Sequence, residues 1–134
     1  KDSDDGDYES FDPMFYGFSR GWGTHYMGEI VGEYYLFNSN EKVHMVHLNM
    51  LPSDKISVGA LYYDFQLDEK NLYDVALSDD QFAEEVNIYV DYSVTDYLYL
   101  SAVAAWASPG DAGEEYTGGD DDSTLFEVFA VVTF

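Results

Sequence analysis

Cysteine is absent from this sequence, and proline and basic residues are scarce. Without cysteine there are no disulfides, thiolate metal ligands or thiol nucleophiles. Only 5 Lys and Arg stand against 27 Asp and Glu, so the formal net charge is −22. This charge excludes binding to a nucleic acid backbone. No run of 18 apolar residues occurs, and the sequence therefore predicts no transmembrane helix.

Aromatic residues are abundant instead, at 18% of 134 residues. Disordered acidic chains are poor in aromatics, so we expect this chain to fold, as one domain. Residues 1–27 form an acidic start and a loop rich in glycine and aromatics, and residues 28–134 carry the β-structure. The opening residues 1–7 lack the apolar segment of a signal peptide. We interpret the chain as a mature form or as the C-terminal piece of a longer protein.

Apolar and polar residues alternate with period two, which predicts long antiparallel strands. In residues 82–94, for example, Val86 and Ile88 alternate with Glu85 and Asp91. Prolines lie outside these stretches, as strand hydrogen bonding requires. The predicted strands cover residues 28–37, 43–51, 56–67, 82–94, 97–107 and 124–134.

Two kinds of structure show such alternation. One is a soluble sheet with one face in the core and the other exposed to solvent, and the other is a transmembrane β-barrel with lipid outside and a polar lumen inside. The predicted strands have roughly 9–12 residues, which is the length that a tilted membrane strand needs. Short turns at 52–55 and 95–96 alternate with long polar connections at 68–80 and 108–123, as in outer-membrane barrels. The sequence therefore favours an all-β fold of antiparallel up-and-down strands, belonging to a transmembrane β-barrel. A soluble sandwich or barrel is the alternative.

The facing of each strand predicts which side chains line the lumen. In residues 56–67 we expect Leu61, Tyr63, Phe65 and Leu67 on the lipid face, opposite Asp64. The predicted lumen carboxylates, which would select the solute, are Glu29, Glu33, Asp64, Glu85, Asp91 and Glu127. Such a lumen repels anions and favours cations or neutral solutes. Tyrosines on the polar face can stack on sugar rings or fill the interior. The candidates are Tyr35, Tyr62 and Tyr89.

The last strand carries an apolar residue at every second position and ends on an aromatic residue, like the C-terminal insertion signal of outer-membrane barrels. Its residues are Phe126, Val128, Val132 and Phe134. Three further segments are distinctive: FDPMFYGFSRGWG at 11–23, GEIVGEY at 28–34 and VGALYYDF at 58–65. With the LFEV sequence at 125–128, they resemble the C-terminal part of the alginate-export family of outer-membrane β-barrels. The resemblance implies a large monomeric barrel that passes an anionic polysaccharide outward.

Six strands are too few to close a bacterial outer-membrane barrel, which needs at least about eight. Open strand edges do not persist in hydrocarbon. We therefore expect a C-terminal fragment of a larger barrel. Its partners would be missing N-terminal strands or further copies of the chain, together with outer-membrane lipid or lipopolysaccharide. The expected location is the outer membrane of a Gram-negative bacterium.

No catalytic site is predicted. Residues 17–21 match the G-x-S-x-G pattern around Ser19, but no helix follows as that chemistry requires. His44 and His47 are three residues apart on a strand, so they point to opposite faces and cannot hold one metal ion. Asp120, Asp121 and Asp122 are either solvated loop charge or a weak calcium site.

The leading hypothesis is thus a pore segment for passive transport or export of a solute, including a polysaccharide, without enzymatic activity. One alternative is a self-assembling extracellular β-rich oligomer or fibre, because long strands with unpaired edges associate readily. A weaker alternative is a secreted carbohydrate-binding β-sandwich.

Overall fold

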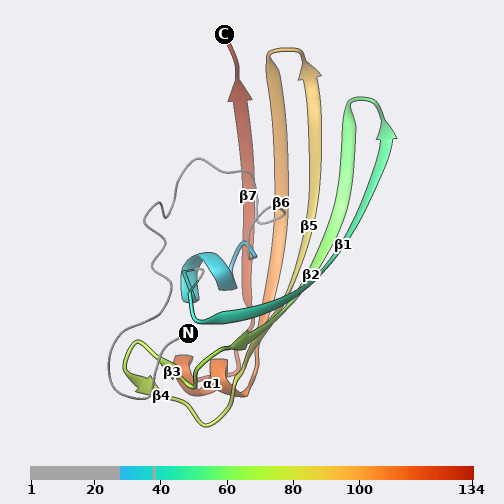
Figure 1. Cartoon of the computed structure of the whole chain (residues 1–134). Coiled ribbons are helices and arrows are strands. Elements are labelled where there is room, and N and C mark those ends of the chain that lie inside the picture. Colours follow the sequence, from blue (N-terminus) through green and yellow to red (C-terminus); the bar gives the residue numbers. More distant parts are fainter. Residues whose placement is uncertain (1–27, 38) are drawn as a thin grey trace.

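The computed structural model describes residues 28–37 and 39–134. Five long strands form one antiparallel sheet in the order β1-β2-β5-β6-β7, and the sheet curves along its length (Figure 1). The five strands are β1 (Glu41–Ser53), β2 (Ile56–Leu67), β5 (Gln81–Thr95), β6 (Leu98–Pro109) and β7 (Ser123–Val132). These are the last five predicted strands, with ends shifted by no more than two residues. The all-β prediction is therefore confirmed.

The connections differ at the two ends of the sheet (Figure 1). Tight turns join β1 to β2 and β5 to β6, as predicted. At the other end, the longer connections contain the small hairpin β3 (Asn71–Leu72) and β4 (Val75–Ala76) and the helix α1 (Asp111–Thr117). These elements were not predicted, because seven residues or fewer are too short to establish a periodic pattern. No helix in the described part is long and apolar enough to cross a membrane.

The middle of β5 buries polar side chains and exposes apolar ones. On β5, Glu85 and Asn87 are both 0% exposed, whereas Val86 is 40% and Ile88 48% exposed. We call the face that carries Glu85 the inner face and the opposite one the outer face. A soluble sheet normally has the reverse arrangement, with its apolar side in the core.

Apolar side chains form a continuous band on the outer face, because strand pairing brings them into rows. Val46, Tyr62, Val86 and Trp106 make one such row across four strands. Towards the long connections the band gives way to polar side chains, including His44 and Glu84. The apolar band consists of Val46, Leu48, Met50, Ile56, Val58, Ala60, Tyr62, Val86, Ile88, Val90, Tyr92, Leu98, Leu100, Ala102, Ala104, Trp106, Phe126, Val128, Ala130 and Val132.

The predicted strand over residues 28–37 is wrong. This segment forms a turn followed by the π-helical turn η2 (Val31–Tyr35), packed against the inner face. Its first backbone N–H groups donate to the Glu85 carboxylate instead of to a neighbouring strand. Gly28 makes this approach possible, because a Cβ there would lie 2.8 Å from the Phe65 ring and 2.9 Å from a Glu85 oxygen.

The predicted facing of β2 is also wrong over residues 61–67. Tyr63 pairs with Glu85, and Asp64 pairs with Glu84. The inner face therefore holds Leu61, Tyr63, Phe65 and Leu67, and the outer face holds Asp64. The physical reason is the position of residues 28–37: Ile30, Val31 and Leu36 give the apolar side chains of β2 a protein layer to pack against.

Candidate functional site

The inner face between the core and the tight turns carries polar side chains from all five strands, with Leu61, Val103, Phe129 and Val131 between them. We call these polar side chains the inner polar surface. It comprises His47, Asn49, Ser57, Glu85, Asn87, Tyr89, Asp91, Tyr99, Ser101 and Glu127. A curved sheet that gathers polar groups on one side can bind or conduct a polar solute there.

Glu85 lies at the inner end of this surface and holds residues 29–31 in place. Its Oε1 accepts hydrogen bonds from Glu29 N (2.7 Å) and Ile30 N (3.1 Å), and its Oε2 accepts from Val31 N (2.8 Å) and Ile30 N (3.2 Å). Three successive backbone donors thus share one buried carboxylate. Hydrogen bonds to a charged acceptor are stronger than neutral ones, so these bonds offset part of the cost of burying the carboxylate.

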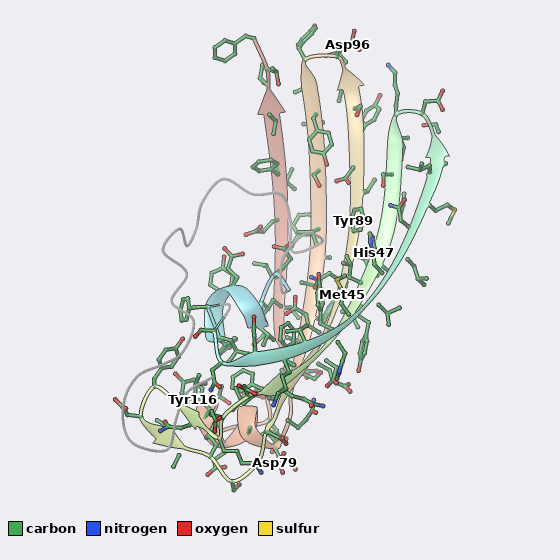
Figure 2. The ribbon with its side chains drawn as sticks, in the orientation of Figure 1. Met45, His47, Asp79, Tyr89, Asp96 and Tyr116 are labelled. Carbon is green, nitrogen blue, oxygen red and sulfur yellow. The ribbon has the colours of Figure 1, made fainter. Side chains whose placement is uncertain are left out.

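A second cluster centres on Tyr89, whose hydroxyl bonds with His47 Nε2 (2.9 Å) and accepts from Asn49 Nδ2 (2.8 Å). Figure 2 shows the His47 and Tyr89 side chains close together, from β1 and β5. The Tyr89 ring lies over Gly59 of β2, where any Cβ would clash with it. Asn49 also donates to Ser57 Oγ at 2.7 Å. These bonds tie three strands together through side chains.

The other side of the inner polar surface carries carboxylates. Asp91 accepts a hydrogen bond from Ser101 Oγ. Glu127 lies on the same face of β7, because it pairs with Val103, which in turn pairs with Tyr89. Asn87 lies between Glu85 and Asp91 on β5 and is fully buried. With Glu85 included, the surface holds three carboxylates and no Lys or Arg among the described residues.

Glu41 is a carboxylate that the sequence did not single out. It is the first residue of β1 and lies on the inner face. Along β1 it is closer to the long connections than Val46, where the apolar band begins. Burial raises its pKa from 4.5 to about 8, and no described residue donates a hydrogen bond to its buried Oε2. No pattern in the sequence points to it, since an acidic residue at a predicted loop end is expected to be solvated.

The structure separates the predicted lumen carboxylates. Glu85, Asp91 and Glu127 share the inner face, as predicted. Asp64 does not: it lies on the outer face, with His44 Nδ1 at 3.2 Å, and accepts from Gln81 Nε2 at 2.8 Å. Glu29 and Glu33 belong to the turn and to η2 rather than to a strand, and Glu29 is buried.

The predicted sugar-stacking tyrosines do not form one platform. Tyr89 is buried in the inner polar surface. Tyr62 lies on the outer face and donates from its hydroxyl to Glu84 at 2.9 Å, and Tyr35 belongs to η2. The residues of the predicted insertion signal all lie exposed, three on the outer face of β7 and one beyond its end: Phe126, Val128, Val132 and Phe134.

Among residues 28–37 and 39–134, no group of three His, Cys, Asp or Glu side chains is arranged to hold a metal ion. Asp120, Asp121 and Asp122 are exposed in the loop after α1 and form no such group. His44 and His47 lie on opposite faces of β1, as their spacing predicts. Ser19 and its G-x-S-x-G pattern fall outside the described residues.

Comparisons of this chain with protein-family models, with curated proteins and with solved structures found no match.

Replacing Glu85 with Gln tests its role as the acceptor for residues 29–31. One carboxylate oxygen becomes an NH₂ donor, so at least one buried N–H group loses its partner, at a cost of about 1–3 kcal/mol. We expect roughly tenfold to hundredfold faster hydrogen exchange at the amides of residues 29–31. Glu84→Gln, on the outer face of the same strand, is the matched control. Equal exchange rates in the two variants would show that Glu85 does not hold this segment.

Glu41→Gln tests the pH dependence that burial imposes. Because the pKa of Glu41 is raised from 4.5 to about 8, the folded state keeps a proton that the unfolded chain releases. The stability from protonated Glu41 is complete below pH 4.5 and is lost as the pH rises through about 8. The variant should therefore gain on the order of 1–3 kcal/mol relative to the parent between pH 4 and pH 9, measured by urea unfolding. A constant difference across this range would contradict the assignment.

Proposed function

We propose that this chain forms part of the wall of a transmembrane β-barrel, with the apolar band against lipid and the inner polar surface lining a passive pore. The observation that carries the proposal is the inverted polarity of β5, on which Glu85, Asn87 and Tyr89 are buried while Val86 and Ile88 are exposed. Transmembrane barrels have this polarity, with an apolar outside and a polar inside.

The size of the apolar band supports contact with lipid rather than with water. Soluble monomers rarely expose contiguous apolar patches larger than a few hundred Å², and this band crosses all five strands. From Leu98 to Trp106 it measures about 26 Å along the strand at about 3.3 Å per residue. At a strand tilt of about 40° this length covers about 20 Å of the ~25 Å apolar height of outer-membrane barrels. Aromatic side chains mark both ends, with Tyr62 and Trp106 at one and Tyr92 at the other. Aromatic girdles occupy these levels in barrels.

Strand length favours a membrane over a second protein layer. The five strands have 10 to 15 residues, whereas strands of soluble proteins have about 5–6. Within the described residues, β1 and β7 each pair on one side only. Such edges need partners in hydrocarbon, so the proposal includes closure by further strands or further copies of the chain.

The charge of the inner polar surface supports cations or neutral solutes as the transported species. Asp91 and Glu127 lie on it without a Lys or Arg among the described residues. The alginate-export family, which the sequence resembles, is implied to transport an anionic polymer, and an acidic lining would repel it. We therefore propose the barrel architecture of that family with a different preference for solute charge.

A self-assembling β-rich oligomer is the second candidate function. The open edges of β1 and β7 favour it, because unpaired strand edges are templates for pairing with another chain. The net charge of −22 opposes close stacking unless cations screen it.

Tryptophan fluorescence tests whether Trp106 faces lipid. The Trp22→Phe variant leaves Trp106 as the single tryptophan of the chain. After reconstitution into vesicles with lipids brominated along the acyl chains, we expect strong quenching of Trp106, because it lies exposed in the apolar band.

The control is the triple variant W22F, W106F and F129W, which moves the single tryptophan to the inner face of β7. It should be quenched much less than Trp106. Equal quenching, or a chain that stays monomeric in solution without detergent, would overturn the membrane proposal. Fibres with a strand repeat of about 4.7 Å would instead identify the self-assembling alternative.

Ion selectivity tests the pore lining. In planar lipid bilayers with a KCl gradient, we expect a reversal potential that shows K⁺ to be preferred several-fold over Cl⁻, since the lining is acidic. Asp91→Asn with Glu127→Gln should reduce this preference by about half or more, and Asp64→Asn, on the outer face, should leave it unchanged. Anion selectivity, or an equal effect of Asp64→Asn, would contradict the assigned lining.

A further inference from the structure

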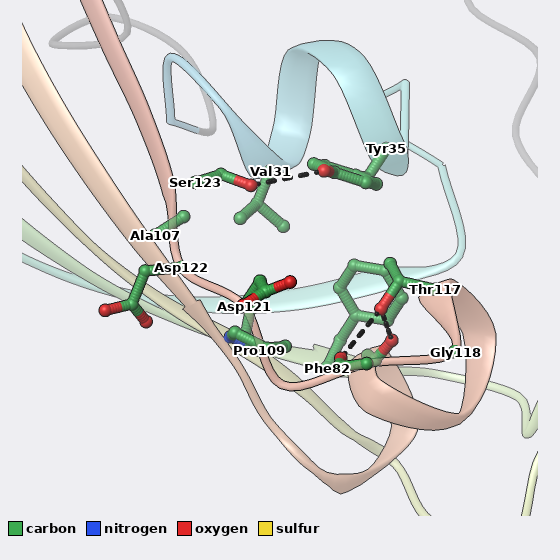
Figure 3. Close-up of a pocket in the computed structure, with 13 residues that line it drawn as sticks. Val31, Tyr35, Phe82, Ala107, Pro109, Thr117, Gly118, Asp121, Asp122 and Ser123 are labelled. Carbon is green, nitrogen blue, oxygen red and sulfur yellow. Dashed lines mark hydrogen bonds between the residues drawn. The ribbon is translucent and has the colours of Figure 1, made fainter.

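A pocket of about 310 Å³ lies at the end of the sheet with the long connections. It is enclosed by η2, the first residues of β5, the last residues of β6 and the loop between α1 and β7 (Figure 3). None of the residues of the inner polar surface lines it. Its volume is at the lower limit of pockets that bind small molecules.

The floor of this pocket is apolar. Val31, Phe82, Ala83 and Ala107 line it and are each almost completely buried. Ala83 on β5 and Ala107 on β6 leave the space open, because each carries only a methyl group. The Phe82 ring packs against Tyr35, with 6.4 Å between ring centroids. This floor fits a compact apolar or aromatic group.

The side walls are fixed by hydroxyl groups that already have partners. Tyr35 Oη and Ser123 Oγ lie 3.3 Å apart and connect η2 to β7. Thr117 Oγ1 donates to the carbonyl oxygen of Gly113 at 2.8 Å, within α1. Hydrogen bonds therefore hold the pocket walls in place on two sides.

The opening of the pocket is acidic. Asp121 lines it, and Figure 3 shows this residue between Val31 above and Phe82 below, whereas the Asp122 carboxylate points away from them. No Lys or Arg is among the described residues that line the pocket. The field of a chain with net charge −22 excludes anions from such a site and concentrates cations.

We propose that this pocket binds an organic ammonium ion with a compact apolar body. The apolar body lies on the floor formed by Phe82 and Ala107, and the ammonium group pairs with the Asp121 carboxylate. The Tyr35 ring adds the attraction of an aromatic face for a cation. The inference does not depend on the membrane proposal, because the pocket shares no residue with the pore lining or with the apolar band.

Calorimetric titration of the whole chain tests this inference, with 2-phenylethylammonium as the probe. We expect a Kd of roughly 0.1–1 mM, as is usual for a ligand of this size. The neutral analogue 2-phenylethanol should bind about tenfold more weakly, and 3-phenylpropanoate should not bind. Ammonium chloride should give no saturable heat, because it lacks the apolar body.

Two variants locate the binding. Asp121→Asn should weaken the amine by about tenfold. Asp120→Asn, the adjacent carboxylate that does not line this pocket, should leave the affinity unchanged. Ala107→Leu fills the floor and should also weaken binding; circular dichroism checks that this variant is folded.

Non-specific attraction to an acidic chain gives a different pattern. It predicts equal binding of the amine and of ammonium chloride, and equal effects of Asp120→Asn and Asp121→Asn. Either result overturns the proposal, as does binding of the alcohol with the same affinity as the amine. If Ala107→Leu fails to fold, the comparison of the three phenyl compounds on the parent chain still decides.

Discussion

The pairing of β5 with β2 on one side and β6 on the other is the constraint on which the rest of this structure depends. Because side chains alternate along a strand, this register assigns Glu85 and Tyr89 to one face and Val86 and Ile88 to the other. A shift by one residue would exchange the two faces and bury the apolar set. Both the apolar band and the inner polar surface follow from this one alignment.

The segment of residues 28–37 covers part of the inner face and stabilises it. Residues 28–37 supply apolar side chains over β2, and three of their backbone N–H groups converge on Glu85. A buried carboxylate is costly unless it is well hydrogen-bonded, so the segment and Glu85 require each other. Nearer the tight turns, the inner face is held together by side-chain hydrogen bonds of Tyr89 with His47 and Asn49 on β1 rather than by apolar packing. The inner face thus changes along the strands from a packed core to a polar lining.

The two ends of the sheet also differ in chemical character. The end with tight turns carries the apolar band close to its edge, whereas the other end holds α1, β3, β4 and the acidic loops. There, Glu115 accepts hydrogen bonds from the backbone N and the Oγ of Ser78, both at 2.8 Å, which joins the two long connections. These bonds lower the pKa of Glu115 below its usual value. The pocket lined by Phe82, Ala107 and Asp121 also lies at this end.

Period-two alternation is a local property of the chain, and it is enough to predict the five long strands, their turns and the shared face of Asp91 and Glu127. Contacts between distant segments, in contrast, take residues 28–37 out of the sheet and turn Asp64 outward. Both segments carry apolar residues at alternate positions, so their pattern fits either face. The face of Asp64 depends on residues 28–37, which cover only one side of β2. The position of residues 28–37 depends in turn on Glu85, an acceptor 54 or more residues away in the chain. A local sequence pattern contains neither of these long-range contacts.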